Sequence, residues 1–236
     1  MEIKNPKVLI LVLCSRNYLS YISSKKQKKI WKKNFENIQI HHFVGKEYQF
    51  EREVDYISNN QYKYLEINTN DNYENIAKKT LLAFEKISSI CEFDYVFRTN
   101  TSSFIDLKKF RSFILKNIDS LDYSGSVLKA TEGDLIASGA GFFISKENIK
   151  IILDNRKYFD TSLPDDVAIA RLLFKFNIKP KNLIRKNLKS IPKPEEILES
   201  NHFHYRCRLD PQYHRILEPL LMNYLDIASK ENKLKS

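Results

Sequence analysis

The chain of 236 residues contains little cysteine, glycine or proline, and it has no long apolar segment. Its three cysteines, Cys14, Cys91 and Cys207, lie far apart without a C-x-x-C pair, which excludes a disulfide scaffold and a zinc ribbon and is typical of a reducing compartment. Five glycines and seven prolines are too few for a collagen-like or low-complexity chain. The longest apolar run, residues 8–14, is far shorter than the roughly 20 residues of a membrane-spanning helix, and no small-residue cleavage site follows it. We therefore expect a soluble, cytoplasmic protein.

The composition is that of a folded, basic protein. Hydrophobic residues make up 42% of the chain and aromatic residues 12%, which is enough for a sizeable core. The 39 basic and 29 acidic residues give a net charge of +10, which favours anionic partners such as phosphorylated small molecules, an acidic membrane or nucleic acid. Because no nucleic-acid-binding motif is present, we expect no nucleic acid among the partners, although charge alone keeps that alternative open.

Hydrophobic periodicity predicts strands that alternate with helices, which is typical of an α/β fold with a mostly parallel central sheet. Residues 8–14 form a continuous apolar run, as in a strand that is covered on both faces. Ser162 and Asp165 have the spacing of a capping box at a helix start. No repeat or linker suggests a second domain. The predicted strands are 7–14, 38–44, 62–67, 93–98, 123–129 and 136–144, with a loop over 46–60; the predicted helices are 17–34, 71–91, 107–118, 145–153, 162–176 and 211–228.

Six lysines surround Trp31 between positions 25 and 33. Such a face could attract phosphate groups or an acidic membrane. The pattern is more often a solvated helix face with one aromatic anchor. We therefore expect peripheral membrane association at most.

The polar turn over residues 98–103 follows a predicted buried strand. Open α/β sheets bind ligands at this carboxyl edge. The guanidinium of Arg98, the amide of Asn100 and the neighbouring hydroxyls of Thr99, Thr101 and Ser102 are suited to an anionic ligand. An ordinary polar turn between a strand and a helix remains the alternative.

Asp165 and Asp166 follow Pro164 at a predicted helix start. Carboxylates in a first turn usually cap backbone N–H groups. At the wall of a pocket, one of the two could instead act as a general base.

His202, His204, Arg206 and Arg208 alternate along the sequence, so an extended segment would place all four on one cationic face. A His-x-His pair can bind a metal, but no carboxylate or cysteine stands at metal-site spacing. We therefore expect an anion site here, or else an edge strand that its charge keeps soluble.

In chain order, five segments resemble motifs of the fringe and β-1,3-galactosyltransferase group of glycosyltransferases. KKIWKKNF, at 28–35, is similar to its R-x-x-W segment, and DNYENIAKKT, at 71–80, to its D-x-Y-x-N-L-x-x-K-T helix start. RTNTSSF, at 98–104, stands where the group has K-x-D-D-D-x-F. SGAGFFIS, at 138–145, resembles its glycine-rich strand, and PDDVAIARLL, at 164–173, its E-D-V helix.

The resemblance implies a single GT-A-like, Rossmann-related domain over residues 1–236. Its nucleotide-sugar-binding core would cover residues 7–176, and residues 177–230 would complete the cleft before a disordered tail at 231–236. The implied activity is transfer of a hexose, with inversion, from a nucleotide sugar, uridine diphosphate being the expected nucleotide, to a hydroxyl or glycan acceptor. The group's anchored members work in the secretory pathway. For this chain we expect a bacterial enzyme of surface polysaccharide synthesis on the cytoplasmic side of the membrane.

The same resemblance implies the site residues. Asp166 would be the general base, with Asp165 as the second candidate. Asn100 and Ser102 would bind the donor ribose or sugar, while Gly139 and Gly141 would let the backbone approach the sugar. The predicted substrate-binding set also contains Tyr73, Lys79, Arg98, Thr99, Thr101, Ala140, His202, Arg206 and Arg208.

The chain departs from the group at its acidic D-x-D cluster. That cluster holds a divalent metal such as manganese against the donor diphosphate, and here it reads Asn100, Thr101 and Ser102. Neutral oxygens and an amide are poor ligands for a hard cation. We therefore expect no metal cofactor, with Arg98, Lys79, His202, Arg206 or Arg208 supplying the positive charge. A catalytically inactive domain that binds a nucleotide sugar or a glycan is the alternative.

Overall fold

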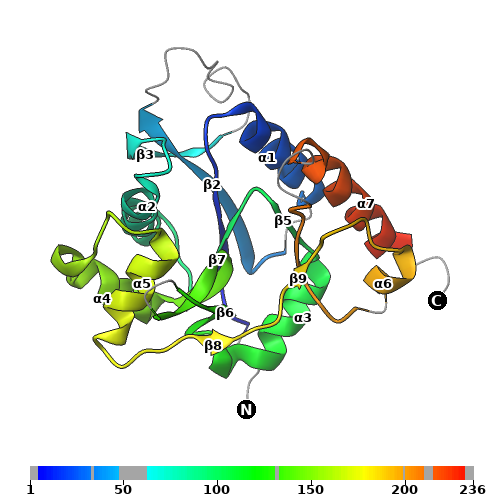
Figure 1. Ribbon diagram of the computed structural model, residues 1–236. Coiled ribbons are helices and arrows are strands. Elements are labelled where there is room, and N and C mark those ends of the chain that lie inside the picture. The colour runs from blue at the N-terminus through cyan, green and yellow to red at the C-terminus, as the bar shows by residue number, and fades with distance from the viewer. Residues whose placement is uncertain are drawn as a thin grey trace.

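The computed structural model describes residues 5–32, 35–47, 63–130, 133–198, 200–209 and 215–231. Its centre is a seven-stranded sheet in the order β3-β2-β1-β4-β7-β6-β8 (Figure 1). Four of the six pairings between these strands are parallel, and β7 runs antiparallel to both neighbours, so the predicted mostly parallel α/β sheet is confirmed. The strands are β1 Val8–Leu13, β2 Ile38–Glu47, β3 Leu65–Asn70, β4 Tyr95–Asn100, β6 Tyr123–Lys129, β7 Leu135–Ser145 and β8 Lys181–Asn182.

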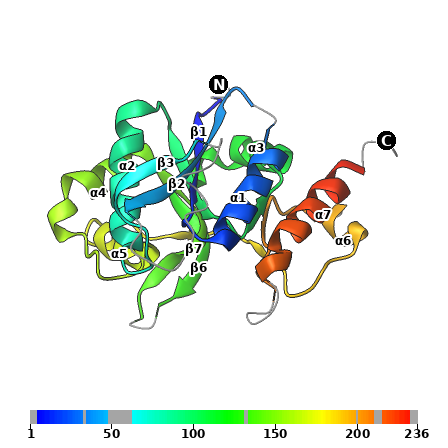
Figure 2. The same ribbon diagram turned by 90° about the horizontal axis from the view of Figure 1, so that it is seen from above.

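Helices cover both faces of this sheet, as both views show (Figures 1 and 2). One face carries α2, α4 and α5, whose core includes Leu9 and Phe84. The opposite face carries α1 and α3, whose core includes Ile10 and Trp31. The alternate residues of β1 thus enter different cores, as its continuous apolar sequence predicts. The helices are α1 Tyr18–Ile30, α2 Ile76–Ile90, α3 Leu107–Asn117, α4 Lys146–Asp154 and α5 Asp165–Phe174.

The C-terminal part adds a second, three-stranded sheet that the sequence analysis did not predict. Its middle strand, β10, runs antiparallel to β5 and parallel to β9. Phe104 and Tyr205 of this sheet pack with Met222 of the last helix in a third core. These elements are β5 Ser103–Ile105, β9 Lys186–Asn187, β10 His204–Arg206, α6 Pro194–Leu198 and α7 Glu218–Glu231, and the 3₁₀ turns are Ile118–Ser120, Arg156–Tyr158 and Arg215–Leu217.

Several predicted element boundaries are wrong. The helix expected over 71–91 begins at Ile76, and the one expected over 17–34 ends at Ile30. The helix expected from Ser162 begins at Asp165 because Pro164 occupies its N-cap, and Ser162 instead hydrogen-bonds Asp160. The third strand lies over Leu65–Asn70 rather than 62–67. The last helix begins at Glu218 rather than at position 211. Most of the predicted 46–60 loop, residues 210–214 and the predicted tail beyond residue 231 lie outside the described residues.

All three cysteines are free thiols, and Cys14 and Cys207 are buried. None of the helices in the described parts of the chain combines the length and the apolar character that a membrane crossing requires.

Candidate active site

A cavity of about 180 Å³ opens at the carboxyl ends of the parallel strands β1 and β4. This is the edge at which open α/β sheets bind ligands. The cavity brings together the polar turn after β4, the glycine-containing strand β7, the start of α5 and the second sheet. Its lining residues are Leu13, Tyr73, Ile76, Arg98, Asn100, Ser138, Gly139, Ala140, Pro164, Asp165, Asp166 and Arg206.

The carboxylate of Asp166 is held at the wall of this cavity by backbone donors. Its Oδ2 accepts a hydrogen bond from the N–H of Gly139 at 2.7 Å, and its Oδ1 accepts one from the N–H of Val167 at 3.0 Å. The side chain is partly exposed and lines the cavity. A Cβ on Gly139 would lie 3.0 Å from Asp166 Oδ2, so a larger residue there would crowd the carboxylate. This geometry presents a fixed carboxylate to a ligand.

Arg98 and Asp165 form a buried ion pair beside Asp166. Nη2 of Arg98 contacts Oδ2 of Asp165, and Nη1 donates to the carbonyl of Gly139. Thr80 also donates to Asp165, at 2.8 Å. Burial raises the pKa of Asp165, and the charge of Arg98 opposes that rise. We expected the guanidinium of Arg98 to bind a diphosphate, but Asp165 neutralises its charge within the protein. The ion pair fixes α5 against β4.

The turn after β4 is largely engaged with the protein itself. Thr99 is buried, and its hydroxyl donates to the carbonyl of Ala140 at 2.8 Å, so it does not face the cavity. Asn100 lines the cavity, but its Oδ1 accepts hydrogen bonds from the N–H and hydroxyl of Ser102 at 3.1 and 2.7 Å. Thr101 and Ser102 are buried. Of the expected donor-binding groups in this turn, Asn100 and Arg98 line the cavity, and the guanidinium of Arg98 is paired with Asp165.

Gln27 fixes this turn from α1, and sequence reasoning missed it. Its amide nitrogen donates to the carbonyls of Asn100 and Ser103 at 3.1 and 2.8 Å. Its Oε1 lies 3.2 Å from Nε2 of His42. The only signal in the sequence is one uncharged polar residue within a run of lysines.

The donor set of this turn does not fit a divalent metal. Hard cations take carboxylate and carbonyl oxygens, and here the Asn100 oxygen already accepts two hydrogen bonds from Ser102. Of the two nearby carboxylates, Asp165 is paired with Arg98 and Asp166 with backbone N–H groups. Within the described ranges, no three His, Cys, Asp or Glu side chains lie together as a metal-binding group.

The alternating C-terminal histidines and arginines do not form the expected cationic face. His204 is buried, and burial, followed by the charges of Arg185 and Arg206, holds its pKa well below the usual value, so its ring is neutral. A Cβ on Gly141 would lie 2.2 Å from Cε1 of His204. Glycine at position 141 therefore makes room for His204 rather than for a sugar.

The other three residues of that segment lie in different surroundings. His202 lies 2.7 Å from the hydroxyl of Ser200, measured from Nδ1, and it is not among the lining residues. Arg208 is exposed beyond β10. Arg206 alone lines the cavity.

Lys79 is a structural residue rather than a phosphate ligand. Its buried Nζ donates to Oδ1 of Asp71 at 2.5 Å and to the carbonyl of Cys14 at 3.1 Å. Asp71 also accepts the N–H groups of Arg16 and Gly45 at 2.5 and 2.8 Å. The Asp and Lys of the D-x-Y motif thus tie together the segments that follow β1 and β3. Tyr73 of the same motif is exposed and lines the cavity.

Two further residues, one lining the cavity and one in contact with that lining residue, were not found from the sequence. The hydroxyl of Ser138 lines the cavity and lies 3.2 Å from Nη1 of Arg185. Arg185 also donates through Nε to Oδ1 of Asn187 at 2.9 Å. Arg185 lies in a polar stretch without a motif, and the pairing of β9 with β10 in the folded protein brings it close to the cavity.

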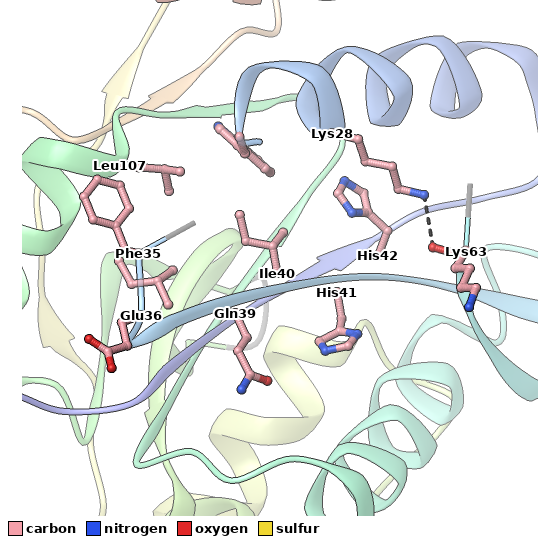
Figure 3. A pocket seen from close by; sticks show the side chains of 11 residues that line it. Lys28, Phe35, Glu36, Gln39, Ile40, His41, His42, Lys63 and Leu107 are labelled. Carbon is pink, nitrogen blue, oxygen red and sulfur yellow. Dashed lines mark hydrogen bonds between the residues drawn. The ribbon is translucent and has the colours of Figure 1, made fainter. Parts of the chain in front are cut away.

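A larger cavity, of about 620 Å³, borders the first half of β2 (Figure 3). Lys28, whose Nζ donates to the carbonyl of Lys63 at 3.2 Å, lies at this cavity with His41 and His42. Burial lowers the pKa of both histidines. Glu36 is the one carboxylate in its lining. This cavity lies at the first residues of β2 and not at the carboxyl ends of β1 and β4.

The lysine-rich helix has the aromatic anchor that its sequence suggests. Trp31 is buried and donates from Nε1 to the carbonyl of Ile105 at 3.1 Å. Lys25, Lys29 and Lys32 are exposed. Membrane attraction by this face stays a prediction.

Comparison with known proteins bears on the family and the fold of the chain. The galactosyltransferase family model matches residues 22–136, just under half of the chain. A glycosyltransferase involved in the glycosylation of the major capsid of PBCV-1 has a similar structure, with 11% identity, a TM-score of 0.54, and coverage of 93% of this chain and 100% of that one. The galactosyltransferase LgtC, solved with donor and acceptor sugar analogues, is 13% identical with a TM-score of 0.48, covering 97% of this chain and 100% of its own. No curated protein sequence matches the chain. The fold is that of GT-A glycosyltransferases, and the family match supports a glycosyltransferase.

Proposed function

We propose that the protein transfers a hexose from a nucleotide sugar, with uridine diphosphate as the expected nucleotide, to a hydroxyl of a glycan acceptor. The observation that carries the proposal is the Asp166 carboxylate, which two backbone N–H groups fix at a cavity beside the carboxyl ends of β1 and β4. The galactosyltransferase match and the GT-A fold support the same reaction class.

The proposed reaction is a single displacement with inversion. The acceptor oxygen attacks the anomeric carbon while the bond from that carbon to the diphosphate oxygen breaks, and the electron pair leaves with the diphosphate. Asp166 takes the acceptor proton as general base, and its hydrogen bonds to Gly139 and Val167 set the direction of the carboxylate. Tyr73 and Asn100 line the remaining wall and are proposed to contact the donor.

Two measurements test this function. Nucleotide sugars are first screened by thermal unfolding, because a bound ligand at a hundred times its dissociation constant stabilises the fold by about 2.7 kcal/mol, or roughly 5 to 10 °C. Proton NMR of the transferred sugar then reports its anomeric configuration. Inversion is the expected result, and retention of configuration would refute a direct displacement assisted by Asp166.

A second candidate, an inactive domain that binds a nucleotide sugar or a glycan, is favoured by the missing carboxylates in the turn after β4. It predicts the same thermal stabilisation without any product. Surface polysaccharide synthesis at the cytoplasmic side of a membrane remains a prediction of the family resemblance.

A further inference from the structure

The proposed reaction requires positive charge in the cavity, and the turn after β4 does not supply it. A leaving diphosphate gains negative charge in the transition state, and fixed positive groups must stabilise it. The residues that replace the acidic cluster do not fit a metal, and Arg98 is neutralised by Asp165. The inference below rests on the proposed sugar transfer, and it concerns the groups that supply this charge.

Arg206 reaches the cavity from the second sheet. It lies on β10, and its register partner on β9 is Asn187. Its Nε is buried and has no hydrogen-bond partner within the described chain. Such a donor requires an acceptor, because leaving it unsatisfied destabilises the folded protein. An anion in the cavity would be that acceptor.

Arg185, the residue directly before β9, lies beside the same cavity. Its Nη1 lies 3.2 Å from the hydroxyl of Ser138, which lines the cavity, and its Nε donates to Asn187, the register partner of Arg206. These contacts hold the guanidinium plane in one orientation. Arginine held in this way can bind two phosphate oxygens at once.

Nearby carboxylates are engaged elsewhere. Asp165 is paired with Arg98, and Glu218, which lies within electrostatic range of Arg206, accepts from Nε of Arg215 at 3.2 Å. Among the residues that the structure describes, neither Arg185 nor Arg206 has a carboxylate within ion-pair distance.

Electrostatic effects of the two arginines agree with their placement. Burial and then the charge of Arg206 lower the pKa of Arg185 to about 10. Burial, followed by the charge of Arg208, lowers the pKa of Arg206. Two partly desolvated positive charges side by side are unfavourable until an anion binds between them.

We propose that Arg185 and Arg206 together bind the diphosphate of the donor and stabilise it as it leaves, taking the place of the divalent metal. The electron pair of the broken bond goes to the diphosphate oxygen that faces these guanidiniums, while the acceptor proton goes to Asp166. Ser138 positions Arg185 from the cavity wall.

The test measures binding of inorganic pyrophosphate and of uridine diphosphate by calorimetry, with EDTA present throughout. Arg206→Gln and Arg185→Gln should each weaken both probes roughly 10- to 100-fold, as expected for the loss of hydrogen bonds to a charged group. Arg206→Lys should recover part of the affinity, because a point charge lacks the planar fork. The control is Arg156→Gln, since Arg156 is exposed and paired with Glu85 at 2.9 Å. It should bind within about twofold of the wild type.

Two results would overturn the proposal: unchanged affinity in both folded glutamine variants, or, in a parallel titration with manganese in place of EDTA, binding by the wild type that EDTA abolishes. Thermal unfolding of each variant checks that it folds. If Arg185→Gln does not fold, the affinities of Arg206→Gln and Arg206→Lys test the proposal, because Arg206 is the more exposed of the two arginines. Pyrophosphate binding through the arginines without sugar transfer would support the anion site and refute the proposed function. Sugar transfer in the presence of EDTA, with unchanged diphosphate affinity in the arginine variants, would support the proposed function and refute the anion site.

Discussion

Replacing Asp165 by asparagine removes the carboxylate that neutralises Arg98 inside the protein. Both side chains are almost completely buried, at 4% and 2% exposure, and Thr80 donates to the same carboxylate oxygen. Removing one partner of a buried ion pair leaves an uncompensated charge and costs about 3–5 kcal/mol. For a chain of this length the melting temperature should fall by roughly 6 to 20 °C.

The assay is thermal unfolding followed by far-ultraviolet circular dichroism, with Asp166→Asn as the matched control. Asp166 is partly exposed, and the single acceptor oxygen of an asparagine can keep one of the two backbone N–H hydrogen bonds, so this variant should lose about 1–2 kcal/mol. The double variant Arg98→Met with Asp165→Leu should recover much of the lost stability, because it removes both charges. If Asp165→Asn melted within 2–3 °C of the wild type, the pair would not have the structural role assigned here.

Three further results are expected. Gly141→Ala should destabilise the fold by about 1–3 kcal/mol in urea unfolding, because its Cβ would overlap His204; an unchanged midpoint would contradict the packing at this strand. Burial lowers the pKa of His42 and His204, so protons bind the unfolded chain first as pH falls below about 6.5. The free energy of unfolding from urea titration should therefore be smaller at pH 5.5 than at pH 7.5, by up to about 1.4 kcal/mol per pH unit for each ring. Burial also raises the pKa of the Cys14 thiol to about 12 and raises that of Cys207, so neither should react with a disulfide reagent at pH 8 until the protein is unfolded.

Local sequence patterns were sufficient for much of the fold. Residues 123–129 form a strand with the predicted bounds, and Ser145 caps α4 as expected, because each signal lies within a few neighbouring residues. The capping-box prediction at Ser162 failed because the conformation of Pro164 determined the helix start. The second sheet was missed because its three short strands come from distant parts of the chain.

The candidate site was predictable only in part, for a similar reason. The sequence pointed to Asp166, Asn100 and Arg206, and all three line the cavity. It did not reveal that Asp165 neutralises Arg98, because that contact joins β4 to α5 through the tertiary fold. Charge alone does not distinguish a ligand-binding arginine from one that has an internal partner.

The kinetics of Asp166→Asn, measured together with donor binding, test the central claim most directly. With the nucleotide sugar found by thermal screening, release of the nucleoside diphosphate should fall roughly 10²-fold or more, as expected for loss of a general base. The dissociation constant of the donor should stay within about threefold of the wild type, because the proposed base acts on the acceptor proton. Wild-type turnover in a folded Asp166→Asn variant would contradict the assignment of Asp166 and the reaction built on it.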